Sequence, residues 1–208
     1  MPAMNSLKLD SERFTPSKIV CVGRNYLEHI RELGNETPDE MVIFNKPNSS
    51  ISSTLHAARD GEVLHYEGEI CFMLRNRVLH GVGFGLDLTR RELQSKLKTG
   101  GLPWERAKAF DGAACFSDFV SIGDTDISSL SLQLEVDGEL RQDGGYELMM
   151  HKPAQILSGI EAFMSLEDND IIMTGTPKGV GQVAAGERFI GRILAGDREL
   201  VSREWRVE

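Results

Sequence analysis

The stretch "LHYEGEI" (residues 64–70) constrains this chain most, because it places Glu67 and Glu69 two residues apart in a segment that predicts a β-strand. Side chains of a strand alternate between its two faces, so both carboxylates point the same way. The run "ICFML" that follows is apolar on both faces and predicts a strand buried along much of its length. A buried pair of like charges is costly unless it takes up a proton or binds a cation.

Two interpretations of this pair remain open on spacing alone. The pair could lie on the solvent face of an amphipathic strand, where charged residues usually lie. Alternatively, it binds a metal, with Asp87 as a third carboxylate farther along the chain. Oxygen ligands without a neighbouring Cys or His suit a hard ion such as Mg²⁺, Mn²⁺ or Ca²⁺ rather than zinc.

Composition limits the classes of protein to which this chain can belong. Its 208 residues, 40% of them hydrophobic, can bury one core, so we expect a single domain over residues 1–208, with 1–17 as an N-terminal extension. A net charge of -9 excludes a general affinity for nucleic acid or anionic membranes. The absence of a signal peptide and of a membrane-spanning run predicts a cytoplasmic protein. Three widely spaced cysteines fit a reducing compartment.

Hydrophobic spacing predicts a β-rich α+β fold without internal repeats. We expect strands over residues 18–23, 41–47 and 81–88, a hairpin over 130–142 around Asp137-Gly138, and a buried strand that leads into the loop of 169–181. Helices are expected over 25–33, over 89–97 with Thr89 as N-cap, and over 153–166 with proline in its first turn. The 21 glycines lie mostly in or beside the strands, which indicates close backbone approaches in a curved sheet.

His29 and Glu32 lie three residues apart on a predicted helix and therefore share one side of it. A surface ion pair is the simpler interpretation. In the functional one, Glu32 raises the basicity of His29 and the two orient a water molecule. Arg24, in the turn before this helix, either binds an anion or is solvated.

The loop "TGTPKGVG" (174–181) leaves a predicted strand and can present backbone N–H groups and a hydroxyl to a carboxylate. It lacks the GK[ST] ending of a phosphate-binding P-loop, which excludes a nucleotide site of that kind. Lys46 in "FNKP" and Lys108 in "AKAFDG" are candidate anion contacts, with exposed surface charges as the alternative.

Seven segments together resemble the fumarylacetoacetate hydrolase family, and particularly its small single-domain, acylpyruvase-like members. They are "VGRNYLEHIREL", "FNKP", "HYEGEI", "GFGLDLTRRELQ", "GLPWERAKAFD", "VDGELRQ" and "DIIMTGTPKGVG", and they cover most of residues 18–181 in the family's order. The resemblance implies a mixed β-sheet roll with short peripheral helices. The run between Glu69 and Asp87 is shorter than in small family members, which usually carry a helical segment there.

The resemblance also implies a set of site residues. It implies Mg²⁺, with Mn²⁺ or Ca²⁺ as alternatives, bound by Glu67, Glu69 and Asp87. A catalytic dyad on a short lid helix maps to His29 and Glu32, and Lys108 is the third catalytic residue. The expected substrate-binding residues are Arg24, Tyr26, Lys46, Gln94 and Thr176.

The activity implied by the resemblance is Mg²⁺-dependent hydrolysis of the C3–C4 bond of a 2,4-dioxo acid, an acylpyruvate or fumarylpyruvate, to give pyruvate. Oxaloacetate decarboxylation or tautomerisation, and hydration or isomerisation of a 2-oxo-dienoate, use the same site and remain open. A non-catalytic β-rich module that binds Ca²⁺ is the alternative of another class. We further expect a small 2-oxo acid as the bound partner, a homodimer, and a place in aromatic catabolism.

Overall fold

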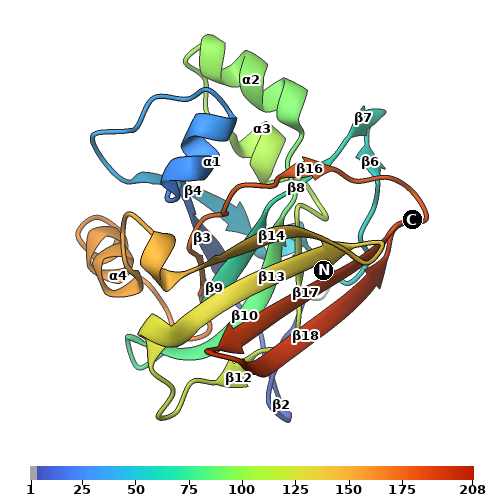
Figure 1. The fold of residues 1–208 in the computed structure, drawn as a ribbon. Helices are drawn as coiled ribbons and strands as arrows, with labels where there is room; N and C mark the ends of the chain where they lie inside the picture. The colour runs from blue at the N-terminus through green and yellow to red at the C-terminus, as the bar shows by residue number, and fades with distance from the viewer. Residues whose placement is uncertain (1–3) are drawn as a thin grey trace.

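The computed structural model describes residues 4–208 and contains two main sheets (Figure 1). In spatial order, the large mixed sheet consists of β4 (Val42–Pro47), β3 (Lys18–Gly23), β15 (Ile171–Met173), β9 (Gly68–Arg75), β10 (Val78–Asp87), β11 (Ala114–Phe116) and β5 (Ile51–Ser52), with β12 (Val120–Ser121) paired to β10. The smaller antiparallel sheet consists of β14 (Glu139–Gly145), β13 (Leu130–Val136), β17 (Arg188–Ala195) and β18 (Arg198–Arg206). The predicted β-rich α+β class with a mixed sheet is confirmed.

Shorter elements surround these sheets. Two-stranded ladders pair β1 (Leu7–Leu9) with β2 (Glu12–Phe14), β6 (Ala58–Arg59) with β7 (Glu62–Val63), and β8 (His65–Tyr66) with β16 (Gly181–Gln182). The helices are α1 (Leu27–Glu32), α2 (Arg91–Thr99), α3 (Glu105–Lys108) and α4 (Pro153–Glu161), with single 3-10 turns at Asn48–Ser50, Ile127–Ser129 and Tyr146–Leu148. Figure 1 shows α1, α2 and α3 gathered at one end of the sheets. Within residues 4–208, no helix is long and apolar enough to cross a membrane.

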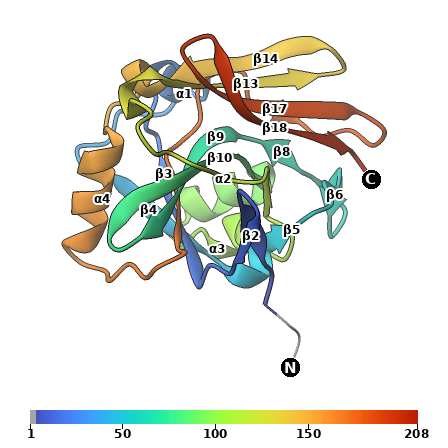
Figure 2. The same cartoon turned by 90° about the horizontal axis from the view of Figure 1, so that it is seen from below.

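Strand β9 is buried on both faces, as its unbroken apolar run predicts. Ile70 and Phe72 point into the core shared with the four-stranded sheet, which lies as a separate layer over β9 and β10 (Figure 2). Cys71 and Met73 point to the opposite face, into a second core closed by Phe119. Glu69 lies two residues before Cys71 in the same strand, so its carboxylate points to the same, second face.

Glycines in β10 let the sheet curl around this second face. Gly83 and Gly85 alternate with core residues, and Gly85 is paired with Glu69. A Cβ atom at Gly83 would lie 3.0 Å from the Phe119 ring, and one at Gly85 would lie 2.5 Å from Cys71 Sγ. At these two positions side chains pack directly on the strand backbone, and glycine leaves the room for them.

Most predicted elements are confirmed, including the hairpin around Asp137-Gly138 and the strand ending at Pro47. The helix expected over 153–166 ends at Glu161. The expected N-cap role of Thr89 is wrong: α2 follows Arg90, and Thr89 pairs instead with His65 in a β-bridge. Its hydroxyl contacts the Asp87 carbonyl and the Lys108 ammonium, so it is not available to cap a helix.

The predicted N-terminal extension forms the β1–β2 hairpin, apart from residues 1–3, which lie outside the described residues. Leu9 and Phe14 are buried in the second core, and the Phe14 ring packs edge-on against Phe119 at a centroid distance of 5.4 Å. The extension therefore covers the curled face of the large sheet. The short run between Glu69 and Asp87 folds as the direct β9–β10 hairpin, without a helix.

Replacing Gly85 with Ala should destabilise the fold, because the added Cβ would lie 2.5 Å from Cys71 Sγ and 2.9 Å from the Phe116 ring. We expect a loss of about 1–3 kcal/mol in the free energy of unfolding, the usual cost of overpacking a core. Urea denaturation measures it. Gly100→Ala is the control, since its Cβ would meet its nearest atom at 3.4 Å and its φ is -83°. Equal stability of the two variants would contradict the close packing at Gly85.

Candidate active site

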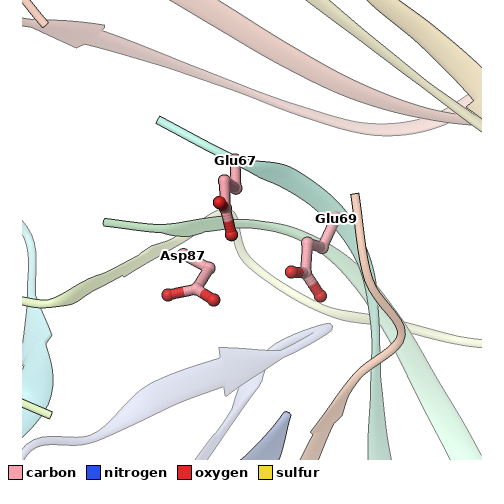
Figure 3. A group of neighbouring side chains, drawn as sticks. All are labelled: Glu67, Glu69 and Asp87. Atoms are coloured by element: carbon pink, nitrogen blue, oxygen red, sulfur yellow. The ribbon is translucent and has the colours of Figure 1, made fainter. Parts of the chain in front are cut away.

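Three carboxylates from neighbouring strands converge on the second face of the large sheet. Glu67 directly precedes β9, Glu69 lies in β9, and Asp87 ends β10. The Asp87 N–H donates to the Glu67 carbonyl at 2.8 Å, which fixes the two strand ends together. All three side chains are buried, and one oxygen from each lies within 4.8 Å of the other two. Figure 3 shows the three carboxylates directed toward a common space.

Three cationic side chains surround two of these carboxylates. The Lys108 ammonium bridges Glu67 Oε2 and Asp87 Oδ2, at 2.7 Å from each. Arg91 forms an ion pair with Glu67 Oε1. Lys46 Nζ lies 2.7 Å from Asp87 Oδ1, while its N–H bonds go to the carbonyls of Lys108 and Ala113. The repulsion between Glu67 and Asp87 is therefore offset within the protein.

Glu69 differs because no cationic side chain among residues 4–208 pairs with it. It accepts a hydrogen bond from the Gly175 N–H at 2.6 Å. Burial, followed by the charges of Asp87 and Glu67, raises the pKa of Glu69 well above its usual range. By contrast, the charges of Lys108 and Arg91 outweigh burial at Glu67 and hold its pKa well below its usual range.

The donor set fits a hard divalent cation. Asp87 Oδ1 is buried with Lys46 Nζ as its neighbour, whereas Glu69 forms no ion pair with any residue among 4–208 and accepts only the Gly175 N–H bond. A cation between the three carboxylates would offset the charge of Glu69 and the repulsion from Asp87 and Glu67. All the donors are carboxylate oxygens, which suit Mg²⁺, Mn²⁺ or Ca²⁺ and leave positions for other ligands.

Lys108 uses all three of its N–H donors on protein atoms. Besides Glu67 and Asp87, it bonds Thr89 Oγ1 at 2.7 Å. Burial opposes its charge, but Asp87 and Glu67 raise the pKa of Lys108, so it is an ammonium at neutral pH. To donate to a bound molecule, Lys108 has to exchange one of these three partners.

The predicted contact between His29 and Glu32 is present on α1, with His29 Nδ1 3.3 Å from Glu32 Oε2. His29 is buried, so this is not an exposed surface pair. Burial lowers the pKa of His29 below its ordinary value of 6.5, which leaves the ring neutral at pH 7. A carboxylate only accepts hydrogen bonds, so Glu32 favours the tautomer with hydrogen on Nδ1 and a free lone pair on Nε2.

The 174–181 loop donates backbone N–H groups to carboxylates of the protein itself. The Gly175 N–H bonds Glu69, and the Gly179 N–H bonds Glu32 Oε1 at 3.0 Å. Thr176 is positioned by Gln142, whose amide donates to Thr176 Oγ1 at 2.8 Å. This loop thus connects the carboxylate cluster to helix α1, which the resemblance implies is a lid.

Most of the predicted site residues line one narrow cavity of about 40 Å³. Those that line it are Arg24, His29, Glu67, Glu69, Asp87, Gln94, Lys108 and Thr176. Glu32 supports His29 from outside the lining.

Tyr26 and Lys46 do not line the cavity. Tyr26 is buried in the core between the sheets, and its hydroxyl has no hydrogen-bond partner among the described residues. Burial and the charge of Glu69 raise the pKa of Tyr26. Lys46 is completely buried and holds Asp87 and the chain around Lys108 in place. The structure therefore assigns both residues positions behind the cavity wall.

Sequence reasoning did not find four polar residues that line the cavity or support it: Asn35, Arg91, Lys98 and Gln142. Helical spacing could have found two of them, because Arg91, Gln94 and Lys98 recur at i, i+3 and i+7 on one face of α2. Gln94 was already expected in the site from the resemblance. Arg91 Nη1 donates to Gln94 Oε1 at 2.9 Å, which leaves the Gln94 NH₂ group available to the cavity.

Comparison with known proteins gives consistent matches. The family described as "Fumarylacetoacetate (FAA) hydrolase C-terminal" matches residues 18–202. The oxaloacetate tautomerase YcgM of Escherichia coli (strain K12) is 36% identical over 189 residues, covering 83% of this chain and 86% of the relative. A mitochondrial oxaloacetate tautomerase of Arabidopsis thaliana is 39% identical over 194 residues, covering 85% and 86%.

Solved structures agree with these sequence matches. The fumarylpyruvate hydrolase of Pseudomonas aeruginosa, solved with Mn²⁺ and pyruvate, superposes with a TM-score of 0.88 at 31% identity. The match covers 100% of this chain and 98% of that one.

Glu69→Gln should weaken Mn²⁺ or Mg²⁺ binding by at least about 100-fold, because it removes the carboxylate of the cluster that has no cationic partner among residues 4–208. Isothermal titration calorimetry with the metal alone measures the affinity. Glu92→Gln, an exposed change on α2, is the matched control and should leave the affinity unchanged. Undiminished affinity in Glu69→Gln would rule out the three-carboxylate site.

Proposed function

Since the chain belongs to the fumarylacetoacetate hydrolase family, we propose that it interconverts the keto and enol forms of oxaloacetate. The observation that carries this proposal is a neutral, buried imidazole in the same narrow cavity as three carboxylates suited to a divalent cation. Its curated relatives named above are oxaloacetate tautomerases that match over most of their length. Because the family's members named here are enzymes, the non-catalytic Ca²⁺ module is set aside.

Tautomerisation moves a proton between C3 and the oxygen on C2. Glu67, Glu69 and Asp87 would hold Mg²⁺ or Mn²⁺, which supplies a Lewis acid for the negative charge that develops on that oxygen. His29 takes the C3 proton on Nε2 and delivers it to the C2 oxygen, which gives the enol and restores the neutral imidazole. The reverse reaction runs the same two transfers backwards. Glu32 stabilises the imidazolium that forms and is itself held by the Gly179 N–H.

The surrounding side chains orient the substrate and exclude water. Gln94 and Thr176 have fixed orientations because Arg91 and Gln142 hold them. Helix α1 covers the cavity and is attached to the 174–181 loop through Glu32, and through Glu28, whose carboxylate lies 2.7 Å from Lys178 Nζ. A closed site of this kind favours proton transfer over reaction with solvent.

Hydrolysis of an acylpyruvate or fumarylpyruvate is the second candidate. The similarity to the fumarylpyruvate hydrolase favours it, together with a His29–Glu32 pair that could activate water. Decarboxylation of oxaloacetate and reactions of 2-oxo-dienoates remain further possibilities of the same site. Assays of the purified protein with Mg²⁺ on oxaloacetate, acetylpyruvate and fumarylpyruvate separate them. Enol–keto interconversion without pyruvate release supports the tautomerase, and release of pyruvate from the dioxo acids supports the hydrolase.

The homodimer, the cytoplasmic location and the place in aromatic catabolism rest on the sequence and on the resemblance alone. Each stays a prediction.

His29→Ala should lower the tautomerisation rate by about 10²- to 10⁴-fold, the usual contribution of a positioned general base. Metal affinity and melting temperature should change little, because His29 ligates nothing and α1 is peripheral. Enol absorbance follows the rate, and His56→Ala, an exposed histidine outside the cavity, is the control. Full activity in folded His29→Ala protein would rule out the assignment of His29 as the base.

The pH dependence of kcat/KM should likewise depend on the protonation of His29. A protonated His29 cannot accept a proton, so activity falls as the pH drops through the pKa of His29 in the folded protein. Burial lowers that pKa below 6.5, and the midpoint of the acid limb of kcat/KM should therefore lie below 6.5. Residual activity of His29→Ala should lack this limb. A midpoint above 6.5 that persists in the variant would assign it to another group.

A further inference from the structure

The carboxylates that line the cavity are more deeply buried than two of its cationic side chains. Glu67, Glu69 and Asp87 are fully buried, whereas Arg24 and Lys98 are half-buried and thus lie closer to solvent. A bound molecule therefore meets cations on the solvent side and the carboxylate cluster deeper inside.

Two of the four cations that line the cavity are already paired. Arg91 pairs with Glu67, and Lys108 pairs with Glu67 and Asp87. Arg24 and Lys98 have no carboxylate partner among residues 4–208. Partly buried cations without a partner are unfavourable, so this part of the cavity favours an anion.

Lys98 is held in the cavity wall rather than free in solution. It follows Arg91 and Gln94 on the same face of α2, and its ammonium donates to Asn35 Oδ1 at 2.6 Å. Asn35 lies just beyond α1, so the contact joins the lid helix to α2. Burial and the charges of Arg24 and Arg91 lower the pKa of Lys98, which reflects like charges held near one another. One neutral acceptor leaves two N–H donors of Lys98 for a ligand.

Arg24 is held in an uncommon backbone conformation. Its φ is +56°, in the left-handed region that non-glycine residues seldom adopt. The next residue, Asn25, is fully buried and bonds the His151 and Thr174 carbonyls and the His151 N–H. The fixed backbone therefore presents to the cavity a guanidinium that has no partner among the described residues, and it can bind a carboxylate in bidentate fashion.

We propose that Lys98, together with Arg24, forms a subsite for the second carboxylate of the substrate, and that Lys98 makes the enzyme prefer oxo diacids to oxo acids with an uncharged tail. This inference rests on the proposed oxo-acid activity and deepens it. Asn35 acts as a positioning residue that orients the Lys98 ammonium. The 2-oxo-carboxylate end lies toward the three carboxylates, and the second carboxylate lies between Arg24 and Lys98.

Turnover of two substrates by the Lys98→Met variant tests this subsite. Oxaloacetate ends in a carboxylate and acetylpyruvate in a methyl ketone, and both undergo keto–enol exchange. We expect kcat/KM for oxaloacetate to fall about 10- to 100-fold, mainly through KM, the usual effect of losing a hydrogen bond to a charged group. The value for acetylpyruvate should stay within about threefold. Lys96→Met, an exposed change on the same helix, is the matched control. An equal fall for both substrates, or none for oxaloacetate, would overturn the subsite.

A binding measurement separates failure of the subsite from failure of the proposed activity. D-malate carries two carboxylates and D-lactate one, and neither has an oxo group to enolise. Calorimetry in the presence of Mg²⁺ should show that wild type binds malate more tightly than lactate, and that Lys98→Met loses this preference. Wild type that turns over neither oxo acid but shows this pattern would overturn the tautomerase and support the subsite. Equal malate affinity in wild type and variant would overturn the subsite whatever the turnover. Lys98→Gln replaces Lys98→Met if the latter does not fold.

Discussion

The ammonium group of Lys108, placed between Glu67 and Asp87, is the interaction on which the site depends. Both carboxylates are buried on neighbouring strands, where repulsion would otherwise force a proton onto one of them. Lys46 adds a second positive charge beside Asp87, and Arg91 adds one beside Glu67. This arrangement offsets the repulsion between two carboxylates inside a curled sheet, next to a third, Glu69, that pairs with no cationic side chain among residues 4–208.

Two helices cover the carboxylate cluster, and the half-buried Arg24 and Lys98 line the cavity beside it. Alternating glycines in β10 let the large sheet curl around its second face. Helices α1 and α2 cover the end of the sheet where the carboxylates lie. Helix α1 is attached on one side through Glu32 to the 174–181 loop, and the chain just beyond it is attached through Asn35 to Lys98. The proposed proton transfer at His29 and the proposed recognition of a second carboxylate thus both involve this one short helix.

Local periodicity predicted which side chains share a face but not which of them meet across the fold. Two-residue spacing correctly placed Glu67 and Glu69 together, and three-residue spacing placed His29 beside Glu32. The partners of Lys46 and Lys108 lie on other elements. The sequence around a lysine does not indicate which distant carboxylate it will pair with in the folded protein. Thr89 illustrates the opposite error, because its capping pattern is local whereas the contact with Lys108 determines its role. The metal, substrate and catalytic roles stay predictions.

Anomalous diffraction from crystals grown with Mn²⁺ tests the central claim, that the three carboxylates form one metal centre. The account predicts a single strong peak in the cavity, with an oxygen of Glu67, of Glu69 and of Asp87 each about 2.0–2.6 Å from it. A manganese peak elsewhere, or no peak in the cavity while Lys108 still bridges Glu67 and Asp87, would contradict it.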